Sequence, residues 1–174
     1  MIREVRTYPD PVLKKVSKKV VDFGQELHTL LDDMCDTMLA ENGVGLAAIQ
    51  VGVALNVLVI LIPSEEDDSQ NREDLFEIIN PKIIAKSGTE IYREGCLSIP
   101  EYYDEVERAA EVEIAYQDRT GASKTLKADG LLAIAIQHEM DHLAGHLFVE
   151  RLPMLKRKKF EKEWKKRARE NKRF

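Results

Sequence analysis

The fold is decided by one stretch, Leu131-Leu132-Ala133-Ile134-Ala135-Ile136-Gln137-His138-Glu139-Met140-Asp141-His142. It follows Asp129, a residue type that often caps the start of a helix, and precedes Gly145, a residue type common just after the end of one. Because the stretch is apolar on nearly every side, we predict a helix that is buried inside the protein.

A second helix is predicted nearer the N-terminus. Asp22 and Gln25 resemble a capping box, and Asn42-Gly43 ends the helical pattern. Between them, apolar residues recur at helical spacing, namely Leu27, Leu30, Leu31, Met34, Cys35, Met38 and Leu39. Cys35 lies within this apolar stripe, so we interpret it as a core residue.

Short strands account for most of the remaining pattern. Residues 55–62 are strand-like, residues 75–85 are strand-like with an interruption at Asn80-Pro81 that favours an edge or a bulge, and residues 106–116 alternate with period two. Residues 118–121 signal a turn, after which 123–127 form the next strand of a hairpin. We therefore predict an α+β fold, with antiparallel β-sheets and hairpins around one buried helix.

The composition is that of a globular protein of 174 residues, with 44% apolar and 33% charged residues. We expect residues 1–174 to form a single catalytic domain. Met1 to Arg6 lack the apolar region of a secretory signal, and the longest apolar run, 57–62, is too short to cross a bilayer. We expect a cytoplasmic protein without membrane association, whose Cys35 and Cys96 are thiols or metal ligands rather than a disulfide.

The last residues carry a charge opposite to that of the rest. Residues 154–174 hold eleven Lys or Arg against three Asp or Glu, a local charge of about +8, whereas the remainder carries about −13. We predict a basic C-terminal helix that contacts an anionic surface such as RNA. The alternative is an amphipathic helix that is simply solvated.

The buried helix also carries the strongest chemical signal. His138 and His142 are four residues apart, so both imidazoles lie on one helix face and can bind one metal ion. Glu139 points away from both rings and can reach a water molecule in the open coordination position. The alternative, two histidines satisfied by hydrogen bonds in a core, requires a separate partner for each buried polar group.

The third ligand is not fixed by this motif. In the metalloprotease pattern with a third histidine, that histidine is replaced here by Phe148, and His146 is expected to be a surface residue. Glu161 and Glu163 lie at a plausible distance for a glutamate ligand, but in a helix that looks solvated. Cys96 follows a glycine and is the best soft ligand available.

Three segments resemble the signature motifs of peptide deformylases, in the same order and with similar spacing. They are Gly43-Val44-Gly45-Leu46-Ala47-Ala48-Ile49-Gln50, Glu94-Gly95-Cys96-Leu97-Ser98 and Gln137-His138-Glu139-Met140-Asp141-His142. The resemblance extends from about Pro9 to about Leu155. It implies removal of the formyl group from the N-terminal methionine of newly made bacterial polypeptides, with release of formate.

The resemblance also implies a role for individual residues. Cys96, His138 and His142 would bind the metal, Fe(II) in the cell and often Zn(II) or Ni(II) in preparations. Glu139 would transfer the proton, while the Gln50 side chain and the Leu97 amide would stabilise the oxyanion. A second group of residues would contact the substrate, and we list for this role Val44, Gly45, Gly95, Leu131, Ile134 and Ala135. Taken singly, each apolar member of this group could equally be a core residue.

Two further expectations concern positions near the cysteine motif and the tail. The resemblance implies that Glu94 pairs with Arg108 and so steadies the loop that presents Cys96. Together with the basic charge of the tail, it also implies that residues Lys156 to Arg173 dock on the ribosome. The chain departs from many relatives at Tyr102-Tyr103, where an arginine is common. Residues 65–68 look like an acidic insertion without an assigned role.

Overall fold

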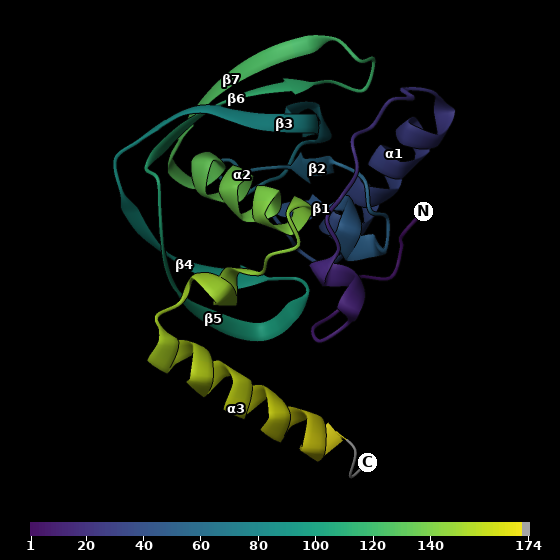
Figure 1. Ribbon diagram of the computed structural model, residues 1–174. Coiled ribbons are helices and arrows are strands. Elements are labelled where there is room, and N and C mark those ends of the chain that lie inside the picture. Colours follow the sequence, from purple (N-terminus) through teal and green to yellow (C-terminus); the bar gives the residue numbers. More distant parts are fainter. Residues whose placement is uncertain (172–174) are drawn as a thin grey trace.

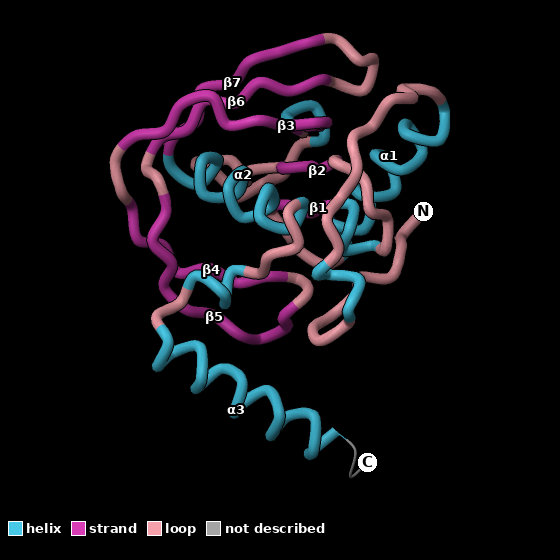
Figure 2. Tube along the Cα trace, viewed as in Figure 1, coloured by secondary structure: helices cyan, strands magenta, loops and turns pink. Residues whose placement is uncertain are grey.

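Seven strands and three α-helices make up the part of the chain that the structure describes, residues 1–171 (Figures 1 and 2). The structure is a computed structural model. Four short 3-10 helices (η) complete the element order, which is η1 Pro11–Lys14, α1 Gln25–Ala40, β1 Gly45–Ala47, η2 Ala48–Val51, β2 Val57–Ile60, η3 Arg72–Asp74, β3 Phe76–Ser87, β4 Glu90–Cys96, β5 Ile99–Arg108, β6 Glu111–Gln117, β7 Ser123–Asp129, α2 Gly130–Leu143, η4 Phe148–Arg151 and α3 Met154–Asn171.

The strands form two antiparallel sheets. Five of them are ordered β1-β2-β3-β6-β7, while β4 and β5 pair with each other in a separate sheet. Helix α2 contacts β1, β2, β6 and β7, and a hydrogen bond from its His138 reaches Glu94 of β4. Figure 1 shows α2 between the two sheets. The predicted α+β fold with antiparallel sheets around one buried helix is therefore confirmed.

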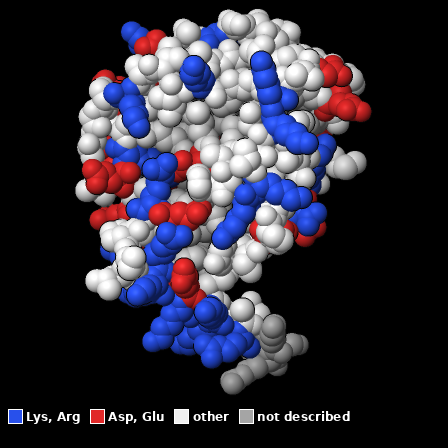
Figure 3. All heavy atoms as spheres, in the orientation of Figure 1, with Lys and Arg blue, Asp and Glu red and all other residues white. Residues whose placement is uncertain are grey.

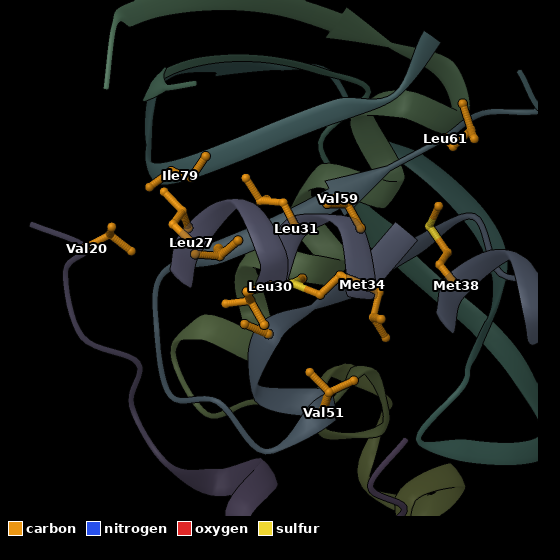
Figure 4. Packing of buried hydrophobic residues seen from close by; sticks show 13 residues of the cluster. Val20, Leu27, Leu30, Leu31, Met34, Met38, Val51, Val59, Leu61 and Ile79 are labelled. Atoms are coloured by element: carbon orange, nitrogen blue, oxygen red, sulfur yellow. The ribbon is translucent and has the colours of Figure 1, made fainter. Parts of the chain in front are cut away.

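Strand β2 divides the interior into two layers. Val57 and Val59 pack with α1, whereas Leu58 and Ile60 pack in the cluster that contains the apolar side of α2. This alternation follows from the two-residue period of a strand, and it explains why all four side chains are buried. Figure 4 shows the first layer, in which side chains of α1 point toward Val59 and Ile79.

The N-terminal helix begins later than the capping pattern suggested. Gly24 is its N-cap and makes no side-chain cap, so the capping box at Asp22 was wrong. Asp22 instead accepts a hydrogen bond from the amide of Gly24 at 2.9 Å. The apolar face was predicted correctly, because Leu27, Leu30, Leu31, Met34 and Cys35 are all buried.

The segment predicted as one strand over 106–116 is two strands. β5 ends at Arg108 and β6 begins at Glu111, so the chain passes from one sheet to the other between them. The side chain of Gln137 on α2 holds this corner, since it accepts from the Ala109 amide at 3.0 Å and donates to the Ala109 carbonyl at 2.9 Å. The bulge predicted at Asn80-Pro81 is confirmed, because the β3–β6 register shifts between Ile79 and Lys82.

Helix α2 is held in place by its surroundings more than by its cap. Asp129 occupies the N-cap position but makes no side-chain hydrogen bond there, which corrects the predicted capping role. The helix runs from Gly130 to Leu143 and buries apolar residues such as Ile136. Four polar residues of its C-terminal half are buried as well, namely His138, Glu139, Asp141 and His142.

The basic helix α3 is joined to the body by a few residues. Phe160 is buried in a cluster with Tyr102 and Phe148, and Trp164 Nε1 donates to the Tyr8 carbonyl at 3.2 Å. Leu155, near the start of the same helix, is 84% exposed. The predicted extension of this helix to residue 174 lies partly outside the described residues. Within residues 1–171, no helix combines the length and the apolar character that a membrane crossing needs.

Candidate active site

Two histidines of α2 form the centre of the site. His138 and His142 are one helical turn apart, with ring centroids separated by 5.2 Å. The Nδ1–H of His138 donates to Glu94 Oε1 at 2.8 Å, which leaves its Nε2 free to face the site. A carboxylate behind a histidine is the arrangement that orients imidazole ligands around metal ions in proteins.

Cys96, on the two-stranded sheet of β4 and β5, lies next to the two histidines of α2. It is the last residue of β4, and its Sγ lies 3.3 Å from His142 Nε2. Ligand atoms of Cys96, His138 and His142 all lie within 4.8 Å of one another. One thiolate and two imidazoles at this spacing suit a single divalent ion of intermediate softness, such as Zn(II) or Fe(II). The residues present therefore fit a metal site.

Glu139 lies beside these ligand atoms without belonging to the set. Its Oε1 is 3.7 Å from His138 Nε2, and its Oε2 is buried with no hydrogen-bond partner among residues 1–171. Burial raises the pKa of Glu139 to about 7. Gly45 leaves room for this carboxylate, since a Cβ there would lie 3.1 Å from Glu139 Cγ. A carboxyl group in this environment is suited to accepting and returning a proton.

Glu94, which accepts the hydrogen bond from His138, pairs with Arg108 as predicted. Arg108 Nε and Nη2 donate to the two oxygens of Glu94 at 2.6 and 2.9 Å, and both side chains are buried. Burial alone would raise the pKa of Glu94, but hydrogen bonds from His138 and Arg108 outweigh it and keep the pKa below its ordinary value. The ion pair therefore presents a charged acceptor to His138.

Gln50 approaches Cys96 from η2. Its Oε1 accepts from the Ala47 amide at 2.9 Å, while its Nε2 donates to Ser98 Oγ at 3.0 Å and lies 3.5 Å from Cys96 Sγ. Leu97 sits between Cys96 and Ser98 in the turn from β4 to β5. Both predicted oxyanion donors thus lie next to the cysteine. Ser98, which orients the Gln50 amide, was not predicted from the sequence.

A groove of about 500 Å³ opens onto this cluster. Cys96, Leu97, His138 and Glu139 line one part of it. All six residues predicted to contact the substrate also line it, namely Val44, Gly45, Gly95, Leu131, Ile134 and Ala135. The groove is also lined by Tyr92 and Arg93, which the sequence did not indicate, and by Tyr103.

Of the pair Tyr102-Tyr103, Tyr103 lines the groove and Tyr102 does not. Tyr102 is buried against Phe160, whereas Tyr103 is exposed and lies over Gly95 so closely that a Cβ there would be 2.4 Å from its ring. The Arg93 guanidinium lies 5.7 Å from the Tyr103 ring centre. Any larger residue at position 95 would therefore collide with the Tyr103 ring as it is placed here.

The other ligand candidates lie elsewhere. Glu161 is exposed on α3, and Glu163 pairs with Arg167 of the same helix at 2.9 Å. His146 is exposed and lies 3.6 Å from Glu150. In the described chain, none of these three belongs to the cluster of metal-ligating atoms. The glutamate-ligand alternative is therefore wrong, and the exposed position expected for His146 is confirmed.

Fold and site together define a metal-dependent hydrolase, with two helical histidines, a cysteine and a buried glutamate beside a groove. The family model described as polypeptide deformylase matches residues 2–158. The chain therefore belongs to the polypeptide deformylase family.

Individual relatives agree with this membership. A peptide deformylase of Helicobacter pylori (strain G27) is 56% identical over 162 residues, covering 93% of this chain and 92% of the relative. One of Nautilia profundicola is 53% identical over 165 residues, covering 95% and 94%. The crystal structure of a peptide deformylase from Legionella pneumophila is 40% identical with a TM-score of 0.88, covering 100% of this chain and 99% of that one.

Proposed function

We propose that the site described above removes the N-formyl group from the N-terminal methionine of newly made polypeptides, with Cys96, His138 and His142 holding one divalent metal ion. The observation that carries this proposal is the cluster of these three ligand atoms beside the buried Glu139. Family membership supports the reaction, and the geometry supports the roles proposed for these residues. The whole chain acts as one catalytic domain in this proposal.

The protein's own groups divide the remaining work. When bound, the metal ion polarises the formyl carbonyl and makes a water molecule more acidic. Glu139 accepts the proton of the attacking water and later gives it to the leaving amine, a task that suits a carboxyl group with a pKa of about 7. Gln50 Nε2 and the Leu97 amide donate to the formyl oxygen as negative charge develops on it.

The groove accounts for the choice of methionine. Val44, Leu131, Ile134 and Ala135 line it with apolar side chains that suit an unbranched thioether. Gly45 lies on β1 and Gly95 on β4, and each of these strands is paired along one edge only, so the peptide backbone can bind to the free edges as an added strand. A peptide deformylase of Ehrlichia chaffeensis, 38% identical with a TM-score of 0.87, was solved in complex with actinonin, and we expect the present groove to bind the same compound.

The cell's metal is Fe(II) in this proposal, and Zn(II) or Ni(II) replaces it in preparations. A thiolate with two imidazoles binds each of these ions. The deciding experiment is formate release from a formyl-Met peptide, measured before and after removal of the metal with a chelator. Release should stop without metal and return when metal is added. Release that persists in the fully stripped protein would contradict the proposal.

The basic helix α3 is proposed to bring the enzyme to the ribosome, in the cytoplasm of a bacterium where formylated chains emerge. Figure 3 shows Lys and Arg gathered over α3, and the last 21 residues contain eleven of them. Most of these side chains in the described part are exposed. A dense row of cations facing solvent favours a polyanion such as ribosomal RNA as the partner. Residues 172 and 173, the end of the predicted docking range, lie outside the described chain.

A further inference from the structure

The short helix η4 has no part in the proposed reaction, yet it contacts both the proposed metal ligand His138 and Asp141 of the same helix. The Phe148 ring is stacked on the His138 imidazole, with centroids 5.9 Å apart and planes inclined by 29°. Three residues later, Arg151 Nε and Nη2 donate to the two oxygens of Asp141 on α2 at 2.6 and 2.7 Å. This helix therefore touches both the ring of His138 and the helix that carries it.

Asp141 connects Arg151 to the partner of His138. Arg108 Nη1 donates to Asp141 Oδ2 at 2.9 Å, while Nε and Nη2 of the same guanidinium donate to Glu94. Glu94 Oε1 in turn accepts from His138 Nδ1 at 2.8 Å. Cations and anions thus alternate without a gap from Arg151 at the surface to the imidazole.

Arg151 supplies the charge that completes this chain of contacts. Glu94, Arg108 and Asp141 are buried and contain two carboxylates for one guanidinium, whereas the Arg151 side chain is 50% exposed. Without Arg151, Asp141 Oδ1 would lose its charged donor and one buried carboxylate would lack a compensating cation. Arg108 would then be drawn toward Asp141, and its two-pronged grip on Glu94 would loosen.

We propose that Arg151 is a positioning residue for the metal centre, fixing the orientation of the His138 imidazole through Asp141, Arg108 and Glu94. Phe148 of the same helix limits the tilt of the ring from its other side. The inference rests on the proposed ligand set of Cys96, His138 and His142. Arg151 contacts neither substrate nor metal, so its loss should act on metal binding rather than on the recognition of methionine.

The test compares Arg151→Gln with Arg119→Gln in the full chain loaded with Co(II). Arg119 is the control, because its Nε and Nη2 donate to the two oxygens of Glu77 at 2.9 and 2.5 Å, and it is 34% exposed and lies outside the site. Its Nη2 also donates to Asp32 at 2.8 Å. Three quantities are measured: the Co(II) dissociation constant by chelator competition, the visible spectrum of the bound Co(II), and the thermal unfolding of the metal-free protein.

Arg151→Gln should raise the Co(II) dissociation constant about 3- to 10-fold, less than the 10- to 100-fold typical for a partner in direct contact with a ligand. The Co(II) spectrum of Arg151→Gln should also shift. Arg119→Gln should match the wild type in its Co(II) dissociation constant and in its spectrum. Both variants should unfold at a lower temperature than the wild type. Arg151→Lys keeps the charge without the planar fork, so its affinity should lie between those of the wild type and Arg151→Gln.

Each failure has a different meaning. Equal Co(II) affinity and spectrum in Arg151→Gln and Arg119→Gln would overturn the positioning role. If Arg151→Gln does not fold, a wild-type spectrum and affinity in Arg151→Lys would overturn it as well. The wild-type protein should bind one Co(II) ion and show a thiolate charge-transfer band. If it does not, the proposed ligand set is refuted.

Discussion

Among single residues, Glu139 combines burial with an unpartnered carboxylate oxygen and a pKa raised to about 7. With this pKa, the protonated and ionised forms of the carboxyl group have similar free energies near neutral pH, so the group can both accept and donate a proton there. Glu139→Gln keeps the shape of the side chain but removes the proton acceptor. The variant should bind metal in the wild-type ratio while its turnover falls by about 10²- to 10⁴-fold, as loss of a general acid–base does. Metal analysis beside formate-release kinetics checks both; a variant that loses its metal would make Glu139 a ligand.

Cys96 is predicted to act on the metal itself. Cys96→Ser replaces the thiolate by a hydroxyl, a weak ligand for Zn(II) or Fe(II), so metal affinity should fall by more than about tenfold. Glu163→Gln is the control, because this side chain pairs with Arg167 on α3 and lies outside the cluster. Affinity measured by chelator competition should be unchanged in the control. If the control loses its metal while Cys96→Ser retains it, then Glu163 rather than Cys96 is the third ligand.

The residues of the site differ in how far sequence alone could identify them. His138 and His142 are four residues apart on one helix, so their proximity is a local property that spacing predicts. Cys96 is 42 residues before His138, so ligand chemistry made it only a candidate, and the resemblance to a family assigned it to the same metal as the histidines. Ser98, Phe148 and Arg151 enter through contacts with distant residues, for which the chain carries no local pattern.

Among the elements, the β6–β7 hairpin depends on one turn residue. Asp118 Oδ1 accepts from the amides of Thr120 and Ala122, and from the Thr120 hydroxyl, and Lys124 lies 3.3 Å from Asp118 Oδ2. The Thr120 hydroxyl and these further donors lower the pKa of Asp118 from its ordinary value to about 2. Because the folded pKa is depressed, the ionised carboxylate stabilises the fold above about pH 4, and this contribution is lost as the pH falls toward 2.

Asp118→Asn keeps the shape of this turn but removes the charge. After allowance for solvent screening, the variant should be less stable by about 1 kcal/mol at pH 6. The difference in unfolding free energy between wild type and variant should shrink as the pH is lowered toward 3. Urea titrations of both proteins across this range measure it. A difference that does not change with pH would mean that the charge of Asp118 contributes nothing.

The elements also show where sequence patterns fail. The α1 stripe and the β6–β7 hairpin were predictable, because their signals repeat over neighbouring residues. The corner between β5 and β6 was not, since the apolar alternation continues across Ala109-Ala110 and only Gln137 of α2 fixes the break. The local pattern records which face is buried, but not which sheet receives the strand.

At the scale of the whole molecule, an acidic body carries a basic helix that is partly built into it. Phe160 shares a buried cluster with Tyr102 and Phe148, and Phe148 stacks on His138. Removing the helix after Arg157 would therefore expose this cluster and disturb the metal centre along with any docking surface. Exposed charges can be changed without touching the cluster, so they give the cleaner test of ribosome binding.

The test compares two variants, each with four exposed lysines changed to glutamine. The first changes lysines of α3, namely Lys158, Lys159, Lys162 and Lys166. The control changes lysines of the body, namely Lys14, Lys82, Lys86 and Lys127. If α3 binds ribosomal RNA, the first variant alone should lose co-sedimentation with ribosomes at low salt. Its binding should also depend less steeply on salt, with the slope of log affinity against log salt falling by about 0.7 to 0.9 for each phosphate that α3 no longer neutralises. Both variants should turn over a short formyl-Met peptide at nearly the wild-type rate, because the changed side chains face solvent. Equal loss in both would indicate attraction by overall charge, and no loss in either would leave α3 with packing and solvation as its only roles.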